Sequence, residues 1–498
     1  MTAPPSVRRL ACSTKIYEEA LMSTFGGLNT AYTGLVAARQ GLNTVGQNIA
    51  NANTDGYTRQ RVTTSSIAAT AQTRAVGTAG TIGQGVSVDG VARLGNAQLD
   101  AGVRTSAGAA GYSAVRANAL AAVENSLAEP GDSGLGARLG EFWSGWQTLA
   151  NGADDPTNAS LLLETAGRLA TQVSRGYSAV ETQWASARRD LSAMADDLNS
   201  AAGQVAALNT QIRSALASGG SANELVDQRS QLTTTIAALT GASVRNQADG
   251  TMTVVVGGNA LVSGDFANTL SVFGASSLAG LTNSSGDPAN PVTLAWASGT
   301  SVSMEGGEMA GSLAVLGVAN GSGTGGVLAE AAASYNRFAG SLADKVNAIY
   351  NTSGSGDFFT YEPDSAASTL RVATTTVTAG DPDSGAYDGS VADAIAQLGA
   401  GAAVDSDGAA ITSPSADWTT FVTRLGVTTQ SALQGATIDD AAATSAVGRQ
   451  LANASVDMDE ENVNLLMFQT AYQGAARMLT AVDEMLDTLI NRTGLVGR

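Results

Sequence analysis

The sequence predicts a mainly α-helical, multidomain α+β protein, in which paired terminal helices form a coiled coil and an elongated helical bundle carries outer β-rich domains. Three observations predict this class. Each end of the chain carries an apolar stripe at coiled-coil spacing, long helical stretches lie inside those ends, and the helical period is lost in the middle. Because 498 residues exceed what one hydrophobic core organises, about two to four domains are expected.

The predicted C-terminal helix, residues 463–490, carries an apolar stripe whose members alternate in steps of three and four residues. They are Leu465, Phe468, Tyr472, Ala475, Leu479, Val482, Leu486 and Leu489. This spacing is typical of a coiled-coil seam, and it extends over roughly 36 Å of helix. Because burying each large apolar side chain contributes about 1.5–3 kcal/mol, we expect a partner helix to cover the stripe.

A matching stripe lies near the N-terminus, in a helix predicted from Met22 to Asn51. Its members are Leu28, Ala31, Leu35, Ala38, Leu42, Val45, Ile49 and Ala52. We expect the two terminal helices to pair with each other. The N-terminal helix should stop where Asn51, Asp55 and Gly56 favour turns, and Gly56 can adopt positive φ at low cost.

Residues 1–21 precede the first stripe and do not extend it. Arg8, Arg9 and Cys12 superficially suggest an export or lipoprotein signal, but the apolar region of at least about seven residues that such a signal needs is missing. We therefore expect residues 1–21 to be either a disordered extension or a mis-called start, with Met22 as the native start.

The stretches between the stripes predict the domain organisation. Helices are expected over residues 94–127, 135–149, 156–215, 222–239, 305–317 and 335–351, and short strands over 241–304. Residues 353–430 read as a mixed or β-rich insertion, and helix resumes at Thr437. The predicted domains are 22–93 with 437–498 (terminal coiled coil and connecting segments), 94–242 with 305–352 (elongated helical), 243–304 (β-rich) and 353–436 (mixed or β-rich insertion).

Composition argues against several classes of function. The formal net charge of -18 argues against nucleic acid or an anionic membrane as the main ligand. Histidine is absent, which removes the commonest metal ligand and general base. Cys12 is the single cysteine, so no disulfide framework or thiolate metal site is expected. No apolar run reaches the length of about 18 residues that a membrane-spanning helix needs.

Three motifs could suggest chemistry, and each is better explained structurally. The acidic cluster at residues 457–461 lacks the Gly and Glu that a calcium loop needs, so Asp457 and Glu460 are interpreted as a helix N-cap and its third-residue acid. The GSGTGG run at 321–326 has no Lys and does not follow a strand of a βαβ unit. Trp143, Trp146 and Trp184 lie at helical spacing and are expected in the core. No catalytic, metal or cofactor site is predicted.

Three segments resemble one bacterial protein family. Ser455–Ile490 looks like the C-terminal segment of the flagellar hook-associated protein 1 family, the first of two junction proteins between hook and filament. NELVDQR (223–229) and EGGEMAG (305–311) resemble internal segments of that family. The resemblance scarcely constrains residues 245–300 and 353–430. A further signature, A-N-x-x-T-x-G-Y, is shared by flagellar rod, hook and hook-associated proteins, and it is matched here by Ala50, Asn51, Thr54, Gly56 and Tyr57.

The resemblance implies a structural adaptor that is not an enzyme. Such a protein forms a ring by self-association, joins hook to filament and is required for filament assembly. Its terminal helices line an axial channel, and its partners are the hook protein, the second junction protein and a cytoplasmic export chaperone on the C-terminal helix. It is exported unfolded by the flagellar type III apparatus and resides outside the cell at the hook–filament junction. No nucleic acid, membrane insertion or cofactor is implied.

The resemblance and the two stripes together define a predicted assembly interface. Its residues are Leu28, Leu35, Leu42, Val45, Ile49, Asn51, Thr54, Gly56, Tyr57, Leu465, Phe468, Tyr472, Leu479, Val482, Leu486 and Leu489. The turn at 51–57 is also expected to contact neighbouring subunits. Alternatives within the same class are a hook or rod protein, or a flagellin-like protein. A secreted coiled-coil adhesin that binds through its β-rich middle is the alternative from another class, and a hydrolase has no supporting constellation.

Overall fold

The computed structural model describes residues 14–68, 83–281, 290–320, 322–380, 388–404 and 408–492. The chain divides into two compact units. Unit 1 comprises Met1–Asp100, Gln211–Gln231 and Val447–Arg498, and unit 2 comprises Ala101–Thr210 and Leu232–Ala446. The sequence-based division had placed residues 211–231 in the helical domain, whereas here they group with the terminal segments.

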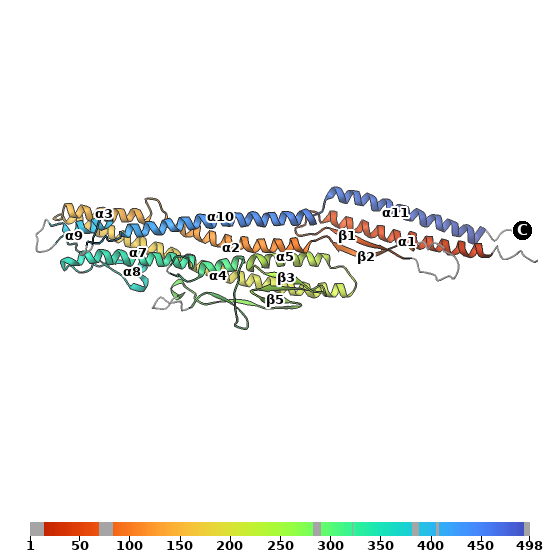
Figure 1. The fold of residues 1–498 in the computed structure, drawn as a ribbon, viewed down its shortest axis with the longest axis horizontal. Coiled ribbons are helices and arrows are strands. Elements are labelled where there is room, and N and C mark those ends of the chain that lie inside the picture. The colour runs from red at the N-terminus through yellow and green to blue at the C-terminus, as the bar shows by residue number, and fades with distance from the viewer. Residues whose placement is uncertain are drawn as a thin grey trace, which may run out of the picture. The chain divides into compact units, whose positions relative to one another are not determined.

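Unit 1 contains the two terminal helices and a hairpin. α11 (Met458–Asp487) lies beside α1 (Thr14–Ala50), as Figure 1 shows. A π-helical turn, η4 (Thr488–Arg492), follows α11. β1 (Gln60–Ser66) and β2 (Val86–Arg93) form an antiparallel hairpin that packs on α1. The predicted pairing of the terminal helices and the end of α1 before Asn51 are confirmed.

The start of α1 differs from the sequence prediction. The helix was expected from Met22, but it begins at Thr14. The segment TKIYEEAL lacks Gly and Pro and is rich in residues with good helix propensity, so the helix continues through it. Thr14–Leu21 are thus helical rather than a disordered extension, while residues 1–13, with Cys12, lie outside the described residues.

The helical part of unit 2 agrees closely with the predicted ranges from α2 to α6, whereas α7 begins earlier than expected. Its elements are α2 (Ala97–Leu127), α3 (Leu135–Asn151), α4 (Pro156–Ala217), α5 (Asn223–Thr240), α6 (Gly307–Leu316), α7 (Val327–Tyr350), α9 (Ser390–Ala400) and α10 (Pro414–Ala454), several of which also give residues to unit 1. Trp146 and Trp184 are fully buried and Trp143 is 9% exposed, so the three tryptophans belong to the core as predicted.

Two antiparallel sheets occupy the predicted β-rich region. One has the order β3 (Ser243–Asn246), β4 (Met252–Val256), β5 (Asn259–Ser263), β6 (Phe266–Ala267), and the other β7 (Leu270–Phe273), β8 (Thr293–Trp296), β9 (Ser301–Val302), with a 3₁₀ turn η1 (Leu278–Leu281) between β7 and β8. Two asparagines of α4 hold them. Asn209 bonds both the N–H and the C=O of Met252 (3.0 and 2.9 Å), and Asn199 does the same for Leu270 (2.8 and 2.9 Å).

The predicted insertion at 353–430 is less β-rich than expected. Its described part holds short elements, namely η2 (Asn351–Ser353), β10 (Phe359–Thr360), η3 (Pro363–Ser365), α8 (Ala366–Thr369) and β11 (Arg371–Val372), followed by α9. Helix then resumes at Pro414, not at Thr437. Threonine and valine weaken the local helix propensity of 414–436, but Trp418, Phe421 and Leu425 bury a helical face, and Trp418 and Phe421 meet Tyr335 of α7.

Candidate functional site

The seam between α1 and α11 is antiparallel and lined by glycines on the α1 side. A Cβ placed on Gly27 would lie 4.0 Å from Cγ2 of Val482, one on Gly34 would lie 4.0 Å from Cβ of Ala475, and one on Gly41 would overlap the ring of Phe468. Each step of seven residues up α1 is matched by seven residues down α11. These glycines therefore let the two helices approach closely.

The predicted stripe of α11 lies in this seam. Val482 is 2% exposed, Leu465, Phe468, Leu479 and Leu486 are half-buried, and Tyr472 is 38% exposed. The side chain of Leu489 lies outside the described residues.

The predicted stripe of α1 is rotated relative to the seam. Ala31, Ala38 and Val45 are buried as expected. Their companions in the seam, however, are Gly27, Gly34 and Gly41, each one residue before a predicted leucine. Leu28, Leu35, Leu42 and Ile49 are only half-buried, because one residue turns a helix by about 100° and moves them to the flank. An apolar pattern cannot reveal that glycine occupies the closest position.

The signature turn after α1 is held by contacts within the chain. The Thr54 hydroxyl donates to Oδ1 of Asn51 (3.2 Å), and the Asn51 amide donates to the carbonyl of Gln47 (3.0 Å). Gly56 has φ +76°, and a Cβ there would overlap Gln231. The Tyr57 hydroxyl donates to Oδ1 of Asn48 (2.9 Å). The signature residues therefore shape and anchor this turn; their predicted contact with neighbouring subunits stays a prediction.

Asn48 stands at the centre of a buried polar network. It is 1% exposed, and its Oδ1 accepts from the Tyr57 hydroxyl and from the Gln60 N–H (3.0 Å). Its amide donates to the Gln60 carbonyl (2.9 Å) and to Oε2 of Glu461 (3.1 Å). All four hydrogen bonds that an asparagine side chain can form are therefore made. The sequence prediction missed Asn48, since the predicted stripe passed through the neighbouring Ile49 instead.

Glu461 brings the start of α11 into the same network. It is 1% exposed, and its Oε1 accepts from Nε of Arg59 at 2.8 Å, while Glu460 pairs with another nitrogen of the same guanidinium. The backbone N–H of Arg59 also donates to the carbonyl of Ala454 (2.9 Å). Asp457 caps α11 as predicted, accepting from the N–H groups of Asp459 and Glu460. Glu460 binds Arg59 instead of completing a capping box.

The NELVDQR segment supplies the third part of the network. Asp227 accepts from the Thr58 N–H (3.0 Å) and from Nε of Arg93. Asn223 donates to Oε1 of Gln60 (3.0 Å), and Gln60 donates to Glu224 (3.1 Å). We call the residues that join these three distant segments the motif cluster: Asn48, Tyr57, Arg59, Gln60, Arg93, Asp227 and Glu461.

Electrostatics of the motif cluster follow from burial and from its carboxylates. Burial, followed by the charges of Glu224, Asp227 and Glu461, raises the pKa of Tyr57 to about 12. Burial, followed by repulsion from Arg93, lowers the pKa of Arg229 to about 10. Tyr57 therefore remains a neutral hydrogen-bond donor at physiological pH.

A second apolar stripe on α11 lies on the flank of the helix, one residue before each position of the predicted seam stripe and thus about 100° around the helix from it. We call it the outer stripe, and its members repeat at the coiled-coil spacing of four and three: Met467, Ala471, Gly474, Met478, Ala481 and Met485. The three methionines are 50–53% exposed. Beside them Leu466 is 64% and Val463 67% exposed, and on α1 Tyr32 is 57% exposed. Each of these side chains is at least 50% exposed, although Met467 also lines a cavity with Gly41 and Val45 of α1.

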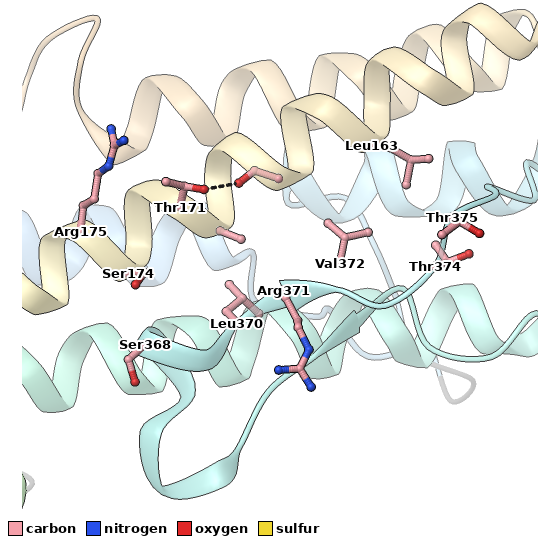
Figure 2. A pocket seen from close by; sticks show the side chains of 12 residues that line it. Leu163, Thr171, Ser174, Arg175, Ser368, Leu370, Arg371, Val372, Thr374 and Thr375 are labelled. Carbon is pink, nitrogen blue, oxygen red and sulfur yellow. Dashed lines mark hydrogen bonds between the residues drawn. The ribbon is translucent and has the colours of Figure 1, made fainter.

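None of the cavities found among the described residues brings together side chains in a catalytic arrangement. One of about 640 Å³ lies between α4 and the segment around β11. In Figure 2 its two arginines, Arg175 and Arg371, extend toward opposite sides, and the Thr171 hydroxyl is bonded to the Gly167 carbonyl (2.8 Å). Among the described residues no group of three or more His, Cys, Asp or Glu is placed to hold a metal ion. The described helices include none with the length and apolar character to cross a membrane.

Three models of flagellar proteins match parts of the chain. Residues 120–356 match the model of the flagellar hook-associated protein FlgK helical domain, residues 450–492 that of the flagellar basal body rod FlgEFG protein C-terminal region, and residues 28–58 that of the flagella basal body rod protein. The range 450–492 contains all of α11, and the range 28–58 contains the signature turn.

Relatives extend these matches along the chain. Flagellar hook-associated protein 1 of Bacillus subtilis (strain 168) is 29% identical over 96% of this chain and 100% of its own length. The protein of the same name from Escherichia coli (strain K12) is 31% identical over 56% of this chain and 48% of its own. The flagellar hook junction protein FlgK from Burkholderia pseudomallei aligns with a TM-score of 0.43 and 25% identity, over 53% of this chain and 46% of that one. The chain is therefore similar to flagellar hook-associated protein 1 along nearly its whole length, and its middle matches the FlgK helical-domain model.

Proposed function

We propose that the protein is a structural component of the bacterial flagellum at the junction of hook and filament, outside the cell. The observation that carries this function is the match to a flagellar hook-associated protein 1 over that relative's entire length. Both terminal helices, which hold the family segments, are also joined through one motif cluster. We further propose that the chain is not an enzyme, since the family that it resembles is structural.

We infer that the protein acts as an adaptor ring formed by self-association. The seam side chains of α11 are engaged by α1 within the chain, so the surfaces free for neighbours are the outer stripe and the leucine flank of α1. Methionine suits such a surface because its flexible thioether adapts to different partners. On this proposal the predicted interface residues divide into two groups. The residues in the seam hold α1 and α11 together. Leu28, Leu35 and Leu42, on the flank of α1, face the hook protein, the second junction protein or another copy of the chain.

The same exposure supports a cytoplasmic export chaperone on α11. Before assembly the outer stripe leaves three methionines about half exposed. Exposed apolar side chains in a regular row favour association, so an unassembled subunit benefits from a partner that covers them. A helical chaperone laid along α11 would contact the row at every turn of three or four residues.

Charge placed on the outer stripe tests the assembly role. The variant Met467→Glu, Met478→Glu, Met485→Glu should fold but fail to restore swimming in a strain that lacks the gene, because carboxylates cannot be buried at a subunit contact. The control Gln469→Glu, Gln473→Glu, Thr480→Glu puts the same charges on the exposed polar flank of α11 and should restore swimming. Normal filaments on cells carrying the methionine variant would refute the assembly role of the outer stripe.

A second candidate is another axial flagellar protein, since both ends match models of rod proteins. Immunogold labelling of isolated flagella separates the two. Label confined to the boundary of hook and filament supports the junction component, and label along the rod or along the whole hook supports the alternative. Label over the cell envelope would contradict both and favour an adhesin.

A further inference from the structure

We propose that Glu461 is the residue that sets the register of the α1–α11 pair. The proposal concerns the chain's own fold and does not depend on the proposed function. It starts from the regularity of the seam. Gly27, Gly34 and Gly41 repeat every seven residues on α1, and they face Val482, Ala475 and Phe468, which also repeat every seven residues on α11.

The apolar part of this seam tolerates a slip of one heptad. If α11 moved by seven residues toward the N-terminus of α1, Phe468 would face Gly34 and Ala475 would face Gly27. Both new partners are glycines, so neither side chain meets a larger obstacle than it does now. A repeat of identical small residues holds the helices close together but does not distinguish one register from the next.

The polar end of the seam does distinguish the native register from the slipped one. One heptad beyond the pair of Gly41 and Phe468 comes the pair of Asn48 and Glu461, joined at 3.1 Å. After the slip, Glu461 would face Gly41 and lose both Asn48 and Arg59. A buried carboxylate without a partner is strongly disfavoured. A buried asparagine in a coiled coil selects register in the same way, and here a carboxylate and a guanidinium reinforce it.

The short linker between α10 and α11 is a second possible determinant of the register, and we call it the tether. The end of α10 is fixed to the hairpin by the bond from the Arg59 N–H to the Ala454 carbonyl and by the Asn453 amide bonded to the carbonyl of Leu94 (3.1 Å). A slip away from this anchor moves α11 by roughly 10.5 Å, at about 1.5 Å per residue. Fully extended, the four Cα–Cα steps from Ala454 to Met458 reach about 14 Å, and the linker already spans part of this distance, so the slip also requires residues at the end of α10 or at the start of α11 to unwind. The linker therefore opposes the slip as well, and the experiment below separates its contribution from that of Glu461.

Cysteine pairs read the register directly in the full chain carrying Cys12→Ser. Gly34→Cys with Ala475→Cys reports the native register, because their Cβ positions are 4.0 Å apart, within the range of a disulfide. Gly27→Cys with Ala475→Cys reports the slipped register, since two turns separate them in the native pair. With Glu461 present, mild oxidation should link the first pair and leave the second at least about tenfold less linked.

Substitution of Glu461 shows whether Glu461 or the linker between α10 and α11 sets the register. In Glu461→Leu the slipped pair should be linked at least about tenfold more than with Glu461 present, whereas Glu461→Gln, which keeps the bond to Asn48, should retain the native link. If Glu461→Leu does not fold, Glu461→Leu with Arg59→Met removes both charges and should give the same shift. A native link alone in the folded leucine variants would overturn the proposal and assign the register to the tether. Slipped links with Glu461 present would overturn it as well.

Discussion

The two compact units bury their helices to different degrees. In unit 2, α4 hides an entire stripe, with Leu169, Val180, Leu191 and Leu198 all fully buried. In unit 1, α11 has two buried residues among those described, Glu461 and Val482, and it exposes methionines along the outer stripe. The helical unit is thus complete within one chain. The pair of α1 and α11 is held by the motif cluster at one end and by small residues along the seam. Much of the apolar surface of α11 therefore stays exposed.

The same substitution made in both units should have the largest and most unequal effect. Leu198→Ala removes a fully buried side chain and should destabilise unit 2 by about 2–5 kcal/mol, because it leaves a cavity. Leu479→Ala removes a half-buried side chain and should cost about 1 kcal/mol in the monomer.

Urea unfolding of the monomer measures this difference separately in each unit. All five tryptophans lie in unit 2, so tryptophan fluorescence follows that unit, while hydrogen exchange of α11 follows the hairpin. Equal costs for the two leucines would contradict the contrast between the units.

Removing a charge from the motif cluster should give the next largest effect. Arg59→Met leaves the carboxylate of Glu461, 1% exposed, without its guanidinium and should destabilise the hairpin by about 3 kcal/mol. Arg61→Met, at an exposed position of β1 two residues further along the chain, is the matched control and should change stability by less than about 0.5 kcal/mol. Hydrogen exchange of α1 and α11 measures both, and equal protection in the two variants would show that the buried pair is dispensable.

Two glycine substitutions sharpen the account of the seam. Gly41→Ala puts a methyl group into the ring of Phe468 and should cost about 1–3 kcal/mol. Gly34→Ala makes an ordinary contact at 4.0 Å and should stabilise α1 by about 0.5–1 kcal/mol, because alanine favours helix more than glycine does. Far-UV circular dichroism during thermal unfolding should show opposite shifts. Shifts of the same sign would mean that the glycines do not set the distance between the helices.

The smallest expected effect is on pH dependence. Folding raises the pKa of Tyr57 from 10.0 to about 12, chiefly by burial, so the folded state favours the neutral phenol. The stabilisation is therefore complete below pH 10 and is lost as the pH rises from 10 to about 12. Tyr57→Phe removes this component, and its hairpin should lose less stability over that range in urea titrations followed by circular dichroism. An unchanged pH profile would contradict the assigned environment of Tyr57.

Patterns that repeat along the chain were predictable from the sequence, and contacts between distant segments were not. The heptad stripes predicted α11, its pairing with α1 and the length of α4, because period and apolar content are local properties. They placed Leu28 and Leu35 in the seam, since a hydrophobic pattern cannot show that glycine permits the closest approach. Composition also hid the start of α10, where tertiary burial of Trp418 and Phe421 outweighs the weak helix propensity of threonine.

The motif cluster shows the same division. The signature turn, NELVDQR and the acidic start of α11 were each recognised as separate segments. Their meeting depends on Asn48 and Gln60, which are ordinary polar residues in sequence and become distinctive only when buried together. The sequence signal that could have indicated it is an Asn that continues the seven-residue row of Gly27, Gly34 and Gly41, together with an acidic helix start elsewhere in the chain.

Hydrogen exchange on the purified monomer tests the central claim most directly. We expect slow exchange in α4 and in the motif cluster. Exchange should be faster along α11 from Met467 to Met485, because α1 covers only one face of that helix. Protection of α11 in the isolated monomer equal to that of α4 would contradict the claim that the terminal hairpin is completed by assembly.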